Sequence, residues 1–152
     1  MKARSPHART VETWLRTVSK GRRGPDLIAS LERAFAALWQ RAGVTLGEIT
    51  LTAVTERVLF DAAATFPAFV AVSVDGGGMH WEPARAHLLS MTDDELRAAA
   101  RSVLVAWLTV LGNLTSDLMT PALHAALADV ALETSTRPGR AWRPRARKDP
   151  KS

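Results

Sequence analysis

The stretch from Thr92 to Leu118, TDDELRAAARSVLVAWLTVLGNLTSDL, decides the fold of this chain. It opens with a capping-box pattern, in which the side chains of Thr92 and Glu95 each satisfy an amide of the first helical turn. Apolar residues then cover more than one face of the predicted helix, which is typical of a central helix or of one shared with a partner. The sequence therefore predicts a bundle built around this helix.

The same excess of apolar residues predicts a protein interface on the helix. We expect another protein or a second copy of the chain to bind there, and we expect the chain to form a homodimer. The candidate interface residues are Val103, Trp107, Leu108, Leu111, Leu114 and Leu118.

Two apolar patterns predict helices in the first third of the chain. A short amphipathic helix is indicated over residues 10–19, where apolar residues fall at helical spacing. A longer helix is predicted over residues 25–42, with Pro25 in its first turn and Gly43 as its stop.

A second capping box, from Thr45 to Glu48, predicts the start of the next helix. Val44 and Ile49 stand at the spacing of a hydrophobic staple across that start. The helix is expected to reach residue 65, and three threonines leave a strand open as an alternative for its first part.

Between Phe69 and Glu82 the apolar period changes from helical to alternating. The segment FVAVSV alternates, residues 75–78 (DGGG) tolerate positive φ, and MHWE resumes an extended pattern, so we predict a β-hairpin. A lone hairpin is marginally stable in water, so it is expected to pack on the helices or to pair with a strand of a second copy.

Thr120 and Pro121 are typical of a helix cap and a first helical residue, and they predict a last helix to about residue 133. The predicted fold class is therefore α+β and mainly α. We expect a single-domain bundle of about four helices carrying a β-hairpin, in the order α-α-β-β-α-α. A chain of 152 residues is long enough to bury one core.

Charge is segregated along the chain. Residues 1–24 carry a formal charge of +6, residues 134–152 carry +6, and the middle carries −7, which together give the total of +5. We therefore expect a basic N-terminal arm (1–24), an acidic globular domain (25–133) and a basic C-terminal tail (134–152). The tail is predicted to be disordered because its single large apolar residue is Trp142.

The composition also indicates a compartment. The chain has no cysteine, which excludes disulfides, thiolate zinc sites and cysteine catalysis and favours the reducing cytoplasm. No secretory signal is recognisable, although the arginine-rich N-terminus leaves an organellar transit peptide as an alternative. We attribute the excess of arginine over lysine to a GC-rich, bacterial genome.

The histidines are the main candidates for chemistry, and none of them predicts a catalytic or metal site. His80 and Glu82 would face one side of a strand, but with His87 they lack a fourth ligand, so a surface patch is favoured. His124 resembles a phosphoacceptor only by lying on a bundle helix; alanines follow it where a basic residue is expected. We expect no cofactor.

Three functional hypotheses remain. The leading one is a non-enzymatic cytoplasmic interaction or regulatory module with a protein partner. The second is a nucleic-acid accessory protein whose basic arms contact phosphates without sequence preference. The third is a small-molecule sensor with a pocket between the hairpin and the helices, around Trp81 and Trp107. For the second hypothesis the contact residues are Arg137, Arg140, Arg143, Arg145, Arg147, Lys148 and Lys151.

Overall fold

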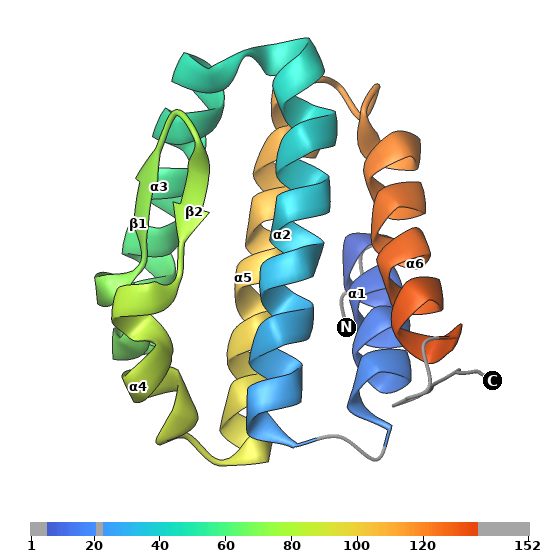
Figure 1. The fold of residues 1–152 in the computed structure, drawn as a ribbon. Helices are drawn as coiled ribbons and strands as arrows, with labels where there is room; N and C mark the ends of the chain where they lie inside the picture. Colours follow the sequence, from blue (N-terminus) through green and yellow to red (C-terminus); the bar gives the residue numbers. More distant parts are fainter. Residues whose placement is uncertain (1–5, 21–22, 137–152) are drawn as a thin grey trace, which may run out of the picture.

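Helix α5 (Asp93–Leu114) runs through the middle of a helical bundle and contacts α1, α2, α3 and α6 (Figure 1). The computed structural model describes residues 6–20 and 23–136. The other long helices are α1 (Pro6–Ser19), α2 (Gly24–Leu46), α3 (Glu48–Ala63) and α6 (Thr120–Thr136). A two-stranded hairpin lies between α3 and α5 in the sequence, so the predicted mainly α fold carrying a hairpin is confirmed.

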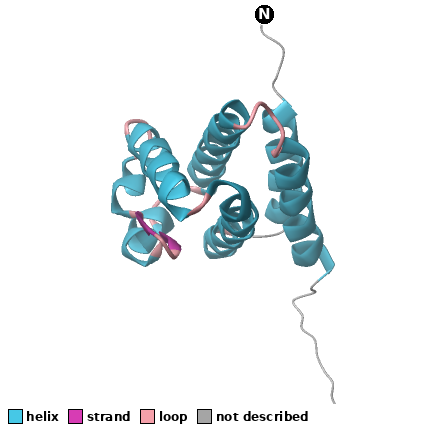
Figure 2. Ribbon diagram, turned by 90° about the horizontal axis from the view of Figure 1, so that it is seen from above, coloured by secondary structure: helices cyan, strands magenta, loops and turns pink. Residues whose placement is uncertain are grey.

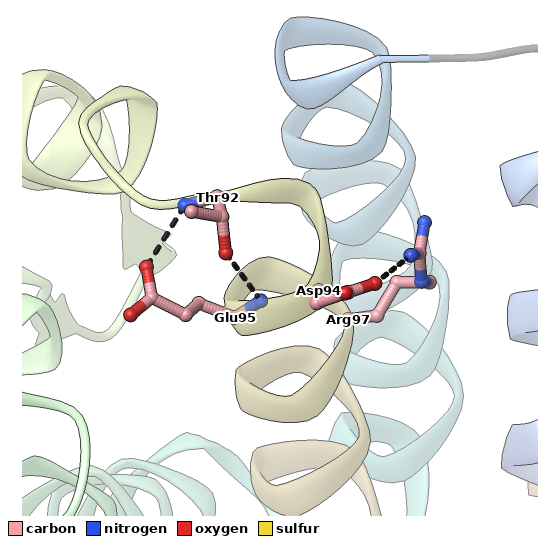
Figure 3. A network of polar contacts seen from close by, with 4 residues as sticks. All are labelled: Thr92, Asp94, Glu95 and Arg97. Carbon is pink, nitrogen blue, oxygen red and sulfur yellow. Dashed lines mark hydrogen bonds and ion pairs between the residues drawn. The ribbon is translucent and has the colours of Figure 1, made fainter.

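The capping box that starts α5 is present as predicted (Figure 3). The amide of Glu95 donates to the Thr92 hydroxyl at 3.1 Å, and the amide of Thr92 donates to the Glu95 carboxylate at 2.9 Å. Two of the first free amides of the helix are thereby satisfied, and Leu96 is buried directly after them. The sequence thus fixes where the central helix begins.

The second capping box, at Thr45–Glu48, is not formed. Helix α2 continues through Thr45 to Leu46, and Gly47 alone makes the turn to α3 with φ of 82°. No side chain caps α3, and the expected staple residues Val44 and Ile49 are 87% and 86% exposed. The sequence pattern was misleading because a single glycine with a left-handed backbone reverses the chain without a capping segment.

The first strand of the hairpin is shorter than predicted. Residues Pro67–Ala71 form a 3₁₀ helix, η1, so the alternation that begins at Phe69 reflects the burial of a tight helix. Strand β1 (Ser73–Asp75) pairs antiparallel with β2 (Gly78–His80), and the predicted DGGG segment makes the turn. The amide of Gly77 donates to the Asp75 carboxylate across this turn at 2.8 Å.

The hairpin packs on the helices of its own chain, with β1 against α3 and β2 against α2. Figures 1 and 2 show it on the side of the bundle opposite to α1 and α6. A Cβ at Gly76 would lie 2.8 Å from the Glu48 carboxylate, so the absence of a side chain allows the turn to approach α3. A short 3₁₀ helix, η2 (Glu82–Ala84), and helix α4 (Arg85–Leu89), neither of which was predicted, return the chain to α5.

Helix α1 is an integral part of the bundle. It contacts α5 and α6, and its apolar residues Val11, Trp14, Leu15 and Val18 are buried. The amphipathic pattern over 10–19 therefore predicted this helix correctly, and the structure extends it back to Pro6.

Trp107 occupies the centre of the core and joins three helices. Its indole N–H donates to the Thr55 hydroxyl of α3 at 2.9 Å, and both residues are fully buried. Its ring also meets Phe35 of α2 edge to face, with ring centroids 5.6 Å apart. One hydrogen bond and one aromatic contact thus fix α3 and α2 against α5.

Replacing Thr55 with valine keeps the shape of the side chain and removes the acceptor. We expect the free energy of unfolding to fall by about 1–3 kcal/mol, because the indole N–H of Trp107 stays buried without a partner. Urea unfolding followed by circular dichroism measures this change. Thr50→Val on the exposed surface of α3 is the control, with an expected change within about 0.5 kcal/mol. Equal stabilities for both variants would contradict the role assigned to this hydrogen bond.

Candidate binding groove between α2 and the hairpin

A groove opens on the surface between α2 and the hairpin and encloses about 500 Å³. Helix α2 contributes one wall, and strand β2 with the residue that follows it contributes the other. The aromatic side chains that line it are Phe35, Trp39 and Trp81, and Met79 lies beside them. Its polar lining consists of Glu32, Arg33 and Gln40 together with the backbone of Gly77 and Gly78.

The tryptophans line the groove because of local backbone features on each wall. Trp39 is half-buried one turn beyond Phe35 on α2, so the two rings lie on the same face of the helix. Gly78, with φ of 121°, lies opposite, and a Cβ built there would stand 4.0 Å from the Trp39 ring, which is an ordinary contact distance. The positive φ, rather than lack of space, therefore favours glycine at this position.

The groove connects directly with the core. Phe35 contacts Trp81 on the groove side, with ring centroids 5.7 Å apart, and Trp107 on the core side. Of the two tryptophans expected around a pocket, Trp81 lines the groove. Trp107 does not line it and is fully buried, in contact with Phe35. A ligand in the groove touches the ring that supports the central tryptophan.

Charge lies at one end of the groove. Arg85 of α4 lies 2.8 Å from the carboxylate of Glu32 and 3.8 Å from that of Glu82. The Glu32 oxygen nearest to Arg85 is buried and has no hydrogen bond of good geometry. This end of the groove therefore holds a carboxylate that is paired by charge and still able to accept a hydrogen bond.

The six residues predicted as an interface on α5 divide into two groups. Val103, Trp107, Leu108 and Leu111 are fully buried within the chain itself. Leu114 and Leu118 are 54% and 84% exposed. The core of the single chain accounts for four of the six residues, and Leu114 and Leu118 are the two that are exposed.

His80 forms an ion pair across the hairpin, with its Nε2 2.9 Å from the Asp75 carboxylate. This contact with His80, followed by the amide of Gly77, lowers the pKa of Asp75 below its usual value. His87 is exposed on α4. Within residues 6–20 and 23–136, no group of three or more histidine, aspartate or glutamate side chains is arranged to hold a metal ion.

His124 is part of a polar cluster that joins α6 to α1. Its Nε2 lies 2.9 Å from Nδ1 of His7, and its Nδ1 lies 3.1 Å from the Thr10 hydroxyl. Burial, and next the charge of His7, lower the pKa of His124, and Asp117 raises it in the opposite sense. Because both ring nitrogens are engaged, the structure favours a role for His124 in packing over phosphate acceptance.

Sequence reasoning placed a pocket between the hairpin and the helices, but it missed Trp39 as part of its lining and it missed the histidine pair. Trp39 was not singled out because it belongs to a helix whose apolar face looked complete without it. His7 and His124 are 117 positions apart, and no local pattern relates them. A half-exposed tryptophan one turn from a core phenylalanine is the signal that was available for the groove.

The seven basic residues proposed as nucleic-acid contacts, from Arg137 to Lys151, lie outside the described residues. That hypothesis therefore remains a prediction. The described helices include none that is both long enough and apolar enough to cross a membrane. Comparisons of the chain with protein-family models, with curated proteins and with solved structures gave no match.

The lowered pKa of His124 predicts a pH dependence of stability. As pH falls below the ordinary value of 6.5, the unfolded chain takes up the proton before the folded chain does. Stability should therefore decrease from pH 6.5 down to the lowered pKa. The groups that face the ring are His7, Thr10 and Asp117, and we expect urea unfolding midpoints to show the decrease between about pH 7.5 and pH 5.

His124→Gln should weaken this dependence, because glutamine keeps hydrogen-bonding capacity and does not titrate. His87→Gln, at an exposed position, is the control and should retain the dependence of the natural protein. An unchanged decrease in the His124→Gln variant would assign the effect to other groups.

Proposed function

We propose that the protein is a non-enzymatic regulatory module that binds a small ligand in the groove between α2 and the hairpin. The observation that carries this proposal is a preformed recess of about 500 Å³ with aromatic walls and a polar end. Small-molecule sites in proteins have this size and this combination of apolar walls and few polar groups.

The lining indicates the chemistry of the ligand. The rings of Trp39 and Trp81 offer flat apolar surface, which suits an aromatic or alicyclic group. At one end of the groove the Glu32 carboxylate suits a hydrogen-bond donor on the same molecule, whereas Gln40 lies about 12 Å further along α2. We therefore infer a ligand with a flat apolar part and a polar group at one end.

The hairpin is the element whose stability would change when a ligand binds. Its strands have three residues each, and so short a hairpin depends on its packing for stability. A ligand that contacts both β2 and α2 would stabilise this packing in proportion to its occupancy. In this proposal the ligand-bound protein has a more stably packed hairpin, whose surface contacts a protein partner in the cytoplasm.

A second candidate function, assembly with a protein partner or a second copy, is favoured by the apolar end of the bundle. The α2–α3 junction and the α5–α6 connection lie at the same end of the molecule, the upper end in Figure 1. Large apolar side chains are exposed at both places, namely Val44, Ile49, Leu114 and Leu118. Exposed apolar residues grouped in this way are typical of interaction surfaces.

The groove proposal predicts binding of the flat, uncharged dye Nile red to the folded protein. Ala29→Trp places a large ring in the groove and should weaken dye binding about tenfold or more. Fluorescence titration of the dye gives the affinity. Ala53→Trp, on the exposed surface of α3, is the matched control and should bind normally. Equal affinities for the two variants would show that the dye binds elsewhere and would contradict the groove. If the dye binds in the groove, its displacement can be used to screen ligands.

The assembly candidate predicts a concentration-dependent dimer in light scattering of the full chain. Ile49→Glu combined with Leu118→Glu should shift the protein to monomer, because each buries a charge in the contact. Phe60→Glu, another exposed apolar position, is the control and should leave assembly unchanged. A natural protein that stays monomeric at high concentration would reject self-assembly.

A further inference from the structure

A second recess lies between α1 and α5, on different helices from the groove, and encloses about 580 Å³. It lies at the C-terminal end of α1 and the N-terminal part of α5, which the helix contacts bring side by side. The charged residues that line it are Glu12 and Arg16 from α1, Lys20 directly after α1, and Asp94, Arg97 and Arg101 from α5.

The charges in this basic cleft are arranged unfavourably for the protein alone. Arg97 and Arg101 are four residues apart on α5, and Lys20, in the turn directly after α1, is four residues from Arg16. Like charges at this spacing lie one turn apart on the same face and repel each other. Both pairs moreover line the same cleft.

The carboxylates compensate only part of this charge. Asp94 forms an ion pair with Arg97, which Figure 3 shows at the first turn of α5. Within the described part of the chain, no carboxylate is within ion-pair distance of Arg16, Lys20 or Arg101. Among the described residues, three cations around one recess thus have no ion-pair partner.

Ser19 adds a hydrogen-bonding group without a partner to the cleft. On the same helix Thr13 and Thr17 donate to the carbonyl four residues before them. The Ser19 hydroxyl makes no such bond, although its oxygen is buried. Buried polar atoms without a partner are rare in proteins, and a bound ligand is one of their causes.

From this arrangement we propose that the basic cleft binds a chain of two or three linked phosphate groups. Arg97 and Arg101 lie about 6 Å apart along α5, the rise of four residues, and Arg16 and Lys20 have the same spacing in the sequence. A di- or triphosphate carries more charge and reaches further than a single phosphate, so it can contact more of these four cations at once. The buried Leu15 forms an apolar floor, and the Ser19 hydroxyl can donate to a phosphate oxygen.

A concave cleft favours this ligand over the backbone of duplex nucleic acid. The unpartnered cations come from two helices and converge on one recess at the end of the α1–α5 pair. Duplex binding instead uses cations spread along a face or a helix, where they follow the phosphate backbone. This inference is independent of the proposed function, because the groove shares no lining residue with the cleft.

Calorimetric titration of the full chain tests the proposal, with inorganic triphosphate, ATP, AMP and a short DNA duplex as separate ligands. We expect triphosphate and ATP to bind, and AMP to bind at least about tenfold more weakly because its single phosphate contacts fewer of these cations. Equal affinities of triphosphate and ATP would show that the phosphate chain alone is recognised. Tighter binding of ATP would indicate an additional contact with the nucleoside. Both outcomes support the proposal that the cleft binds a phosphate chain.

Variants distinguish binding in the cleft from nonspecific electrostatic attraction to the protein. Arg16→Gln and Arg101→Gln should each weaken triphosphate binding roughly tenfold, the usual loss for a hydrogen bond to a charged group. Arg41→Gln, at an exposed position of α2 outside the cleft, removes the same charge and should have no such effect. The melting temperature of Arg101→Gln should be unchanged or higher, because a repulsive pair is relieved.

Three outcomes would overturn the proposal. The first is the absence of triphosphate binding at millimolar concentration. The second is an equal loss of binding in Arg41→Gln, which would indicate nonspecific attraction to a basic chain. The third is duplex binding that depends on Arg16 and Arg101 without any binding of triphosphate, which would identify a nucleic-acid surface instead.

Discussion

The hydrogen bond from the Trp107 indole to the Thr55 hydroxyl is the contact on which the bundle depends. Both groups are fully buried, so loss of either partner would leave a polar group without this hydrogen bond in the core. The bond sets the rotation of α3 about α5, and the edge-to-face contact of Trp107 with Phe35 sets α2. Large apolar residues fill the rest of the core through contacts that have no preferred direction. The one polar pair at the centre thus gives the core a unique arrangement.

This central arrangement extends outward to the groove. Phe35 supports Trp107 on one side and Trp81 on the other, so the wall of the groove is a continuation of the core. Such a wall is rigid because interiors are closely packed, whereas the hairpin that forms the opposite wall is short. The proposed response to a ligand uses this difference: one wall holds its position while the other gains stability.

The histidine pair and the basic cleft show that α1 contributes more than apolar area. At its first turn, His7 contacts His124 of α6, and at its C-terminal end, Arg16 and the following Lys20 line one recess with Arg97 and Arg101 of α5. The first contact is favourable while His124 is neutral, and the second gathers like charges that the proposed anion would compensate. The predicted proton uptake and the proposed anion binding would thus act at opposite ends of the same helix.

The sequence by itself determined the mainly α class, the central helix and its capped start, the buried face of α1 and the turn of the hairpin. These features depend on periodicity and on groups within a few residues of each other. The sequence patterns misplaced the start of α3 and the extent of β1. The expected capping box is replaced by the positive-φ residue Gly47, and the alternating segment begins in the 3₁₀ helix Pro67–Ala71. Only the tertiary structure decided that most of the apolar face of α5 is core, that Trp39 and Trp81 share a groove, and that cations of α1 and α5 share a cleft. Those outcomes depend on which helices become neighbours, and that is settled by packing over the whole chain.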